Sequence, residues 1–152
     1  MAKIDKKIQE NESEDSRVRA LAIFTGKPSE SIEDQGDNSY AIGDEEYLVL
    51  TDEEADEKLK EDIEQSIWAF NPDFIEGETG ISGLAKLIKA ASNECEKLNE
   101  PLLEIVEKTC GIDNFVQDAD DADGRGHFLA SYNDVENEVK VDGKIFYIYR
   151  TN

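Results

Sequence analysis

The sequence lacks the features that would place it in a membrane or outside the cell. No apolar run approaches the roughly 20 residues of a membrane-spanning helix. The N-terminal MAKIDKKIQENESEDS has no apolar core of the kind found in a secretory signal. Cys95 and Cys110 are the only cysteines, and they lack CxxC spacing. We therefore expect buried or partly buried thiols in a reducing cytoplasm.

Basic residues are scarce as well. The chain of 152 residues has 16 basic and 37 acidic side chains, a formal charge of −21 and a pI near 4.2. This balance argues against direct binding of nucleic acid, which needs a basic surface, and against anionic membranes. A typical small domain carries roughly 2–8 net charges, and a larger excess destabilises the folded chain by self-repulsion. The charge therefore favours a basic partner, a cation, or a protein whose own site is shaped for nucleic acid.

Length and turn signals predict one α+β domain. The polar residues 1–15 are expected to form a disordered tail, and 16–152 a single acidic domain. Gly43-Asp44 and Asp142-Gly143 are typical turns between β-rich runs, and they predict two hairpins, at 40–50 and 139–149. Apolar spacing and helix-ending residues predict helices over 16–25, 52–70, 81–96 and 99–110, and a short acidic helix or turn over 113–123. We expect a small antiparallel sheet, made of the hairpins, packed against about four helices.

No catalytic or metal site with a recognisable spacing is present. In DADDADGRGH, residues 118–127, placing Gly124 at position six of a calcium loop puts Ala119 at position one and Ala130 at position twelve. Both essential ligands are then missing. His127, the only histidine, is interpreted as a turn residue packed by its neighbours. We expect no cofactor and no enzymatic activity; weak cation binding stays open for Asp118, Asp120, Asp121 and Asp123.

The most acidic segment is LTDEEADEKLKEDIEQSIWAF, residues 50–70. Part of its charge has a structural reason: Thr51 and Glu54 fit a capping box, and Glu54–Lys58 and Asp56–Lys60 have the i,i+4 spacing of helical ion pairs. The predicted partner-binding surface has four parts. On the helix, one row contains Glu53, Glu57 and Glu61, a second row contains Asp52 and Asp56, and Glu64 lies one turn further on. Before the helix lies a cluster of Asp44, Glu45 and Glu46.

The spacing of carboxylates in such a helical row can be compared with the spacing of phosphates in DNA. Residues four apart on a helix have Cβ atoms about 6 Å apart. DNA carries one phosphate per roughly 3.4 Å of axis on each strand, and an oblique strand spaces its charges somewhat more widely than that rise. A row of helix carboxylates could therefore stand in for a phosphate strand.

Four segments carry a resemblance to known proteins. EEYLVLTDEEAD, SIWAFN, ADGRGHFLASY and FYIYR resemble segments of small acidic proteins of bacteriophages and mobile elements. In length and charge the chain is also similar to antirestriction and anti-CRISPR proteins that imitate DNA. These resemblances imply a location in the cytoplasm of a bacterial host cell, and they carry over no functional residue.

Three functions follow from the sequence as hypotheses. The first is a non-enzymatic acidic binding protein, a DNA mimic that inhibits a host nuclease, a restriction or CRISPR complex, or a DNA-binding protein. The second is a phage or mobile-element accessory protein that binds a protein partner by shape and apolar contacts, with the acidity serving solubility. The third is a weak cation-binding module or enzyme centred on residues 118–127.

Overall fold

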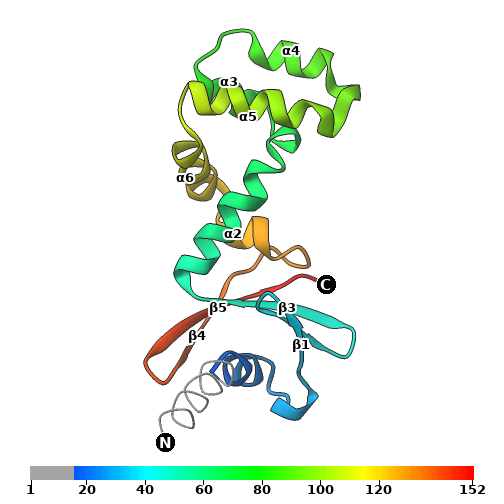
Figure 1. Ribbon diagram of the computed structural model, residues 1–152, viewed down its shortest axis with the longest axis vertical. Coiled ribbons are helices and arrows are strands. Elements are labelled where there is room, and N and C mark those ends of the chain that lie inside the picture. The colour runs from blue at the N-terminus through cyan, green and yellow to red at the C-terminus, as the bar shows by residue number, and fades with distance from the viewer. Residues whose placement is uncertain (1–15) are drawn as a thin grey trace, which may run out of the picture. The chain divides into compact units, whose positions relative to one another are not determined.

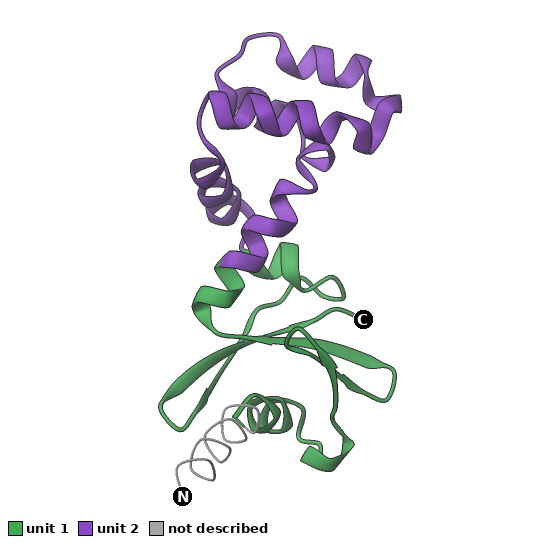
Figure 2. Ribbon diagram, viewed as in Figure 1, with its two compact units in different colours: residues 1–56, 125–152 green, residues 57–124 purple. Residues whose placement is uncertain are grey.

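The computed structural model describes residues 16–152, so the tail predicted at 1–15 lies outside the described residues. These residues form an α+β structure with a five-stranded antiparallel sheet, which confirms the predicted fold class. They divide into two compact units: unit 1 contains 16–56 and 125–152, and unit 2 contains 57–124 (Figure 2). That the two units behave as the single predicted domain stays a prediction.

The sheet belongs to unit 1 and has the strand order β1-β2-β3-β5-β4. Its strands are β1 (Glu33–Gly36), β2 (Ser39–Ile42), β3 (Glu45–Leu50), β4 (Asn137–Val141) and β5 (Lys144–Arg150). Both predicted hairpins are confirmed, and antiparallel pairing of β3 with β5 joins them. Strand β1, which follows the short helical turn η1 (Ser29–Ser31), was not predicted, because its residues Glu-Asp-Gln-Gly have low β propensity.

Both faces of this sheet are buried. On one face, residues 16–25 form the predicted helix, and its Leu21 packs in a cluster with Val49 and Ile148 (Figure 1). On the other face, Tyr149 packs with Leu129 in a second cluster. Alternate residues of β5 therefore serve opposite clusters, as the period of a strand requires.

The helices after the sheet begin with α2 (Asp52–Glu64), whose first five residues belong to unit 1. Unit 2 continues with η2 (Ile67–Ala69), α3 (Pro72–Thr79), α4 (Leu84–Ala90), η3 (Ser92–Leu98), α5 (Asn99–Lys108) and α6 (Ile112–Asp123). Helix α7 (Arg125–Leu129) returns the chain to unit 1. In unit 2, the rings of Phe70, Phe74 and Phe115 pack with centroids 5.1–5.7 Å apart.

Helix α2 is shorter than predicted. Its expected apolar stripe is buried, but the helix ends at Glu64 instead of continuing to residue 70. The side chain of Asn99 accepts a hydrogen bond from the Trp68 N–H at 3.3 Å and donates one to the Glu64 carbonyl at 2.8 Å. Asn99 therefore stabilises this helix end, and its side chain does not cap α5.

Two further boundaries differ from the prediction. Helix α3 was not expected; Asn71 caps it by accepting the Asp73 N–H at 2.9 Å, and Pro72 occupies its first position. The helix predicted over 81–96 is instead α4 followed by η3, with a break at Cys95, whose φ is 53°. The short acidic helix or turn predicted from Asp113 to Asp123 is a helix, α6.

Candidate functional site

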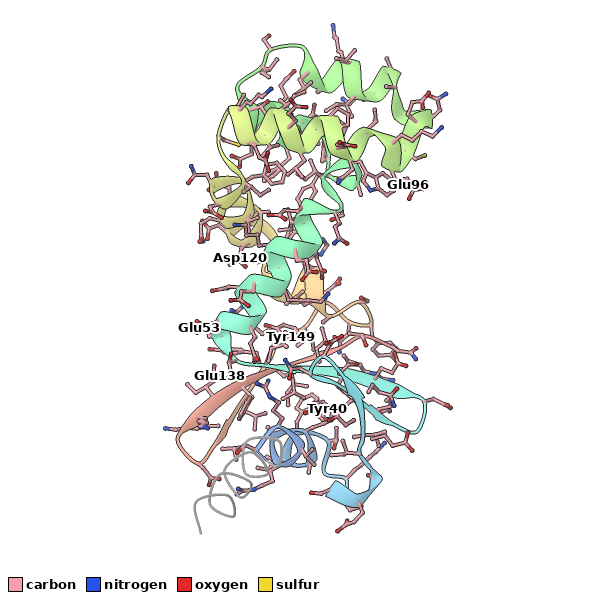
Figure 3. All side chains as sticks on the ribbon, viewed as in Figure 1. Tyr40, Glu53, Glu96, Asp120, Glu138 and Tyr149 are labelled. Atoms are coloured by element: carbon pink, nitrogen blue, oxygen red, sulfur yellow. The ribbon has the colours of Figure 1, made fainter. Side chains whose placement is uncertain are left out.

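The predicted row Glu53, Glu57 and Glu61 is solvent-exposed on α2, and Figure 3 shows Glu53 extending from this helix. Within residues 16–152, none of the three takes part in an ion pair. Their spacing of four residues places them on one side of the helix. The row therefore presents three carboxylates whose charge no described basic side chain offsets.

The second predicted row is different, because Asp52 and Asp56 both bind Arg125. A guanidinium nitrogen of Arg125 lies 2.7 Å from a carboxylate oxygen of Asp52 and 3.0 Å from one of Asp56. The Arg125 side chain is 10% exposed, stacks over the Tyr147 ring at 4.7 Å, and also binds Glu136 at 2.8 Å. Part of the charge of Asp52 and Asp56 therefore holds unit 1 together, and their place in a partner-binding surface stays a prediction.

The sequence around Arg125 explains how it reaches this position. Gly124 ends α6 with φ of 83°, and α7 begins at Arg125. Gly126 is buried so tightly that a Cβ there would lie 2.6 Å from the carbonyl oxygen of Asp134. The segment Gly124-Arg125-Gly126 is therefore the start of a helix that packs closely against the chain before β4.

The contacts of Arg125 and Tyr149 determine the ionisation of these two side chains. Burial acts to lower the pKa of Arg125, but hydrogen bonds to Glu136 and Asp52 outweigh it and raise that pKa above its usual value. Burial, together with a hydrogen bond from its hydroxyl to Glu136, raises the pKa of Tyr149. Both groups therefore keep one protonation state near neutral pH, as suits a structural network.

The predicted cluster before α2 is also partly occupied. Glu45 accepts the Tyr47 hydroxyl at 2.7 Å and lies 3.5 Å from Lys27 and 3.7 Å from Arg150. The Tyr47 hydrogen bond, with help from the two basic groups, lowers the pKa of Glu45, while burial and Glu45 raise the pKa of Tyr47 to about 12. Asp44 and Glu46 remain solvent-exposed.

The ion pairs of α2 differ from those expected from the sequence. The capping box is confirmed, since the Thr51 N–H donates to Glu54 at 2.8 Å and the Glu54 N–H to the Thr51 hydroxyl at 3.3 Å. Glu54 binds Arg17 at 2.8 Å and not Lys58. The two lysines pair elsewhere, Lys58–Asp62 at 3.0 Å and Lys60–Asp113 at 3.0 Å. Glu64, at the end of the predicted surface, is half-buried.

The aspartates proposed as weak cation ligands are distributed along α6. Asp121 accepts a hydrogen bond from Gln117 at 2.9 Å, one turn earlier on the same helix. Among residues 16–152, no three His, Cys, Asp or Glu side chains are grouped as a metal ion would require. The set Asp118, Asp120, Asp121 and Asp123 thus gains no geometric support, and cation binding there stays a prediction. His127 is exposed in α7, with its ring edge-on to Phe128 at 5.0 Å.

A pair of carboxyl groups in unit 2 was not foreseen from the sequence. The carboxyl groups of Glu78 in α3 and Asp118 in α6 are close enough to interact, and a hydrogen bond between them requires that one of the two is protonated. Burial, this hydrogen bond and the negative charge of Asp118 raise the pKa of Glu78 to about 7. The 39 intervening residues contain no signal for the pairing, because it depends on how α3 and α6 pack.

The two thiols differ from each other. Cys95 is exposed, which corrects the expectation of a buried or partly buried group, whereas Cys110 is half-buried as expected. Burial is the main reason that the pKa of Cys110 is raised. Cys110 is therefore a weaker nucleophile than an ordinary exposed thiol at neutral pH.

Comparison with protein-family models, with curated proteins and with solved structures finds no match for this chain. Within the described part, no helix has the length and apolarity needed to cross a lipid bilayer. The distribution of charge is therefore the main indication of function. Unit 2 has 17 acidic residues against six lysines and contains no arginine, so carboxylates predominate there.

Proposed function

We propose that the protein is a non-enzymatic acidic binding protein of the bacterial cytoplasm, acting as a DNA mimic on a basic host partner such as a nuclease, restriction or CRISPR complex, or DNA-binding protein. The exposed row Glu53, Glu57 and Glu61 is the observation that supports this function best. A row kept only for helix stability would include more basic residues, because like charges four apart are unfavourable. The resemblance to acidic phage and mobile-element proteins agrees with such a role.

The residues of the proposed surface do not contribute equally. Asp52, Asp56 and Glu45 have intramolecular basic partners, so their charges contribute less to an external field. Glu53, Glu57, Glu61 and the exposed acids of α5 and α6 contribute more, since most have no basic neighbour. The surface acts through many charges together, and no single carboxylate is indispensable.

The direct test replaces Glu53, Glu57 and Glu61 together by glutamine. This change removes three charges while keeping side-chain size and helix propensity. Partners are first captured from a lysate of the native host, and binding of the isolated partner is then measured from low to high salt. We expect slower association and a shallower salt dependence, because long-range charge guides the encounter.

A matched control separates the row from net charge alone. Glu30, Glu33 and Glu138 are exposed glutamates of unit 1, and their replacement by glutamine also removes three charges. If the two triple variants lose association rate equally, the row has no special part in binding. If neither variant nor salt alters binding, the acidity serves solubility and the mimic function is wrong.

The protein itself is not expected to bind nucleic acid, because its net charge of −21 repels phosphate. A mobility-shift experiment with duplex DNA at low salt should show no complex. A clear complex under these conditions would remove the electrostatic basis of the proposal.

The second hypothesis, an accessory protein that binds by shape and apolar contacts, is favoured by exposed apolar side chains in unit 2. Leu87 of α4 is 65% exposed, and Ile81, in the turn before α4, is 38% exposed. Binding of this kind would persist at high salt, because apolar burial is not screened by ions. The salt series therefore distinguishes the two hypotheses.

A further inference from the structure

Unit 2 contains an apolar cavity of about 420 Å³ beside the end of α2, and we call it the Trp68 cavity. The buried side chain of Ile88 is part of its lining, together with the half-buried side chains of Trp68, Phe70, Pro72 and Leu98. Exposed residues of η2, α4 and η3 complete the lining, so solvent reaches the cavity. Small-molecule and anchor sites in proteins occupy roughly 300–1,000 Å³, which places this cavity at the smaller end of that range.

The size and lining of the cavity suit an apolar side chain. Trp68, Phe70 and Leu98 keep part of their apolar surface in contact with water, and covering that surface would be favourable. Large apolar side chains that enter such a pocket supply much of the affinity of many protein interfaces. The cavity could therefore hold one bulky apolar anchor of a partner segment.

The charges around the cavity decide what kind of segment carries that anchor. Glu94 and Glu96 flank Cys95, which lines the cavity, and Figure 3 marks Glu96 on this segment. The segment also carries one exposed basic residue, Lys97, so its two glutamates outnumber its lysine. Both glutamates are exposed, and within the described residues neither forms an ion pair. The one basic lining residue, Lys89, lies 3.5 Å from Asp73 and is thereby partly neutralised. Unit 2 has 17 acidic residues and six lysines, so its net negative charge would repel an anionic occupant.

From the cavity and its acidic surroundings, we infer that unit 2 binds a basic peptide segment of the partner protein and that one apolar side chain of this segment enters the Trp68 cavity. This inference rests on the proposed function, because it supplies a specific contact for a partner that charge alone would attract without selectivity. Electrostatic attraction sets the rate of encounter, and the buried anchor slows dissociation.

The chain offers a direct probe of occupancy. Trp68 is the only tryptophan, so the intrinsic fluorescence of the protein reports on the cavity. The ligands are three peptides without aromatic residues: a lysine-rich peptide with one central leucine, the same peptide with serine in place of leucine, and the leucine peptide with every lysine replaced by glutamate. We expect the leucine peptide to bind about tenfold or more tightly than the serine peptide, as burial of one leucine side chain predicts.

Each outcome has a defined meaning. Tighter binding of the leucine peptide, with a shift of Trp68 emission to shorter wavelength and no binding of the glutamate peptide, supports the inference. Equal, salt-sensitive binding of the two lysine peptides overturns the cavity site but leaves the acidic surface intact. Failure of both lysine peptides to bind contradicts the proposed function as well. Tighter binding of the glutamate peptide would show that an anionic ligand is preferred.

Two variants test the location of the site. Ser92 is an exposed residue lining the cavity, and Ser92→Leu should fill the entrance and abolish the advantage of the leucine peptide. Ser82 is an exposed serine of the same unit outside the lining, so Ser82→Leu should leave that advantage unchanged. Equal effects of the two substitutions would contradict the assignment.

Protection of the thiols gives an independent measurement. Cys95 lines the cavity and is exposed, whereas Cys110 is half-buried and outside it. The leucine peptide should slow alkylation of Cys95 by iodoacetamide more than the serine peptide does, and alkylation of Cys110 should not change. Equal protection by both peptides would place the leucine elsewhere.

Discussion

All four arginines of the chain lie in unit 1, and each forms an ion pair there, whereas unit 2 has none. The arginine pairs are Arg17–Glu54, Arg19–Asp142, Arg125 with Asp52, Asp56 and Glu136, and Arg150–Glu45. The ion pairs recorded for unit 2 all involve lysine: Lys58–Asp62, Lys60–Asp113, Lys89–Asp73 and Lys108–Glu104.

This difference separates two uses of the same acidic composition. A guanidinium is planar, presents several donors in fixed directions and is weakly hydrated, so it can hold carboxylates at a partly buried site. A lysine ammonium remains hydrated, and exposed lysine pairs contribute little. The carboxylates of unit 1 are thus partly structural, while most of those in unit 2 remain free to act on a partner. The comparison leads to four measurements.

The first concerns Arg125, whose substitution should be the most damaging. Arg125→Met keeps much of the apolar stem but leaves Asp52, Asp56 and Glu136 without their shared cation. We expect a loss of about 2–4 kcal/mol in the free energy of unfolding, below the full cost of a buried pair because these carboxylates are partly exposed. Urea denaturation followed by circular dichroism measures this loss.

The matched control for Arg125 is Arg19, which pairs with Asp142 at the surface, with side chains 46% and 61% exposed. Arg19→Met should cost less than about 1 kcal/mol. If both substitutions cost the same, the buried position of Arg125 has no special importance, and the contrast between structural and free carboxylates is wrong.

The second measurement compares two glycines, one in each unit. At Gly126 of unit 1 a Cβ would overlap the Asp134 carbonyl, so Gly126→Ala should cost about 1–3 kcal/mol through forced displacement of the backbone. At Gly77 of α3 in unit 2 nothing lies within 4 Å of a Cβ. Gly77→Ala should therefore stabilise the protein by about 0.5–1 kcal/mol. Opposite shifts in melting temperature would establish the difference, and a neutral Gly126→Ala would refute the close packing.

The third measurement concerns the carboxyl pair of unit 2. The pKa of Glu78 is raised from 4.5 to about 7 in the folded protein, so the folded chain binds a proton that the unfolded chain releases between these values. The stability that Glu78 contributes is fully present below pH 4.5 and is lost as the pH rises through 7. Relative to the parent, Glu78→Gln should therefore gain about 1 kcal/mol at pH 8, after allowance for solvent screening.

The control for Glu78 is Glu107→Gln, which removes an exposed charge from α5. The difference in unfolding free energy between Glu78→Gln and the parent should grow between pH 5 and 8, while the Glu107→Gln difference should stay nearly constant. A pH-independent difference for Glu78→Gln would mean that Glu78 and Asp118 do not share a proton.

Local signals in the sequence are sufficient to predict much of the fold. The Asp142-Gly143 turn is confirmed because its geometry depends on residues close in sequence. The Thr51–Glu54 capping box is confirmed for the same reason. The apolar stripe of α2 is buried as its period predicts, and the same period explains why the exposure of Glu53, Glu57 and Glu61 could be predicted.

The remaining features depend on distant residues. Helix α2 ends at Glu64 because of Asn99, 35 residues away, and Asp52 meets Arg125 across 73 residues. The residues beside Arg125 in the sequence do not reveal which carboxylates the arginine binds. The cavity beside Trp68 likewise results from the packing of η2, α4 and η3.

The last measurement concerns the row on α2 and has the smallest expected effect on stability. Replacing Glu53, Glu57 and Glu61 by glutamine removes two like-charge contacts at i,i+4, and each such contact costs a few tenths of a kcal/mol, about 0.2–0.5. The triple variant should therefore unfold at a slightly higher temperature than the parent at low salt. The gain should disappear at high salt, because ions already screen exposed charges over a Debye length of about 3 Å at 1 M. A loss of stability at low salt would mean that these carboxylates hold the folded chain together, as Asp52 and Asp56 do. In that case the row would belong with the structural acids of unit 1, and the acids of α5 and α6 would be the remaining candidates for a phosphate-like surface.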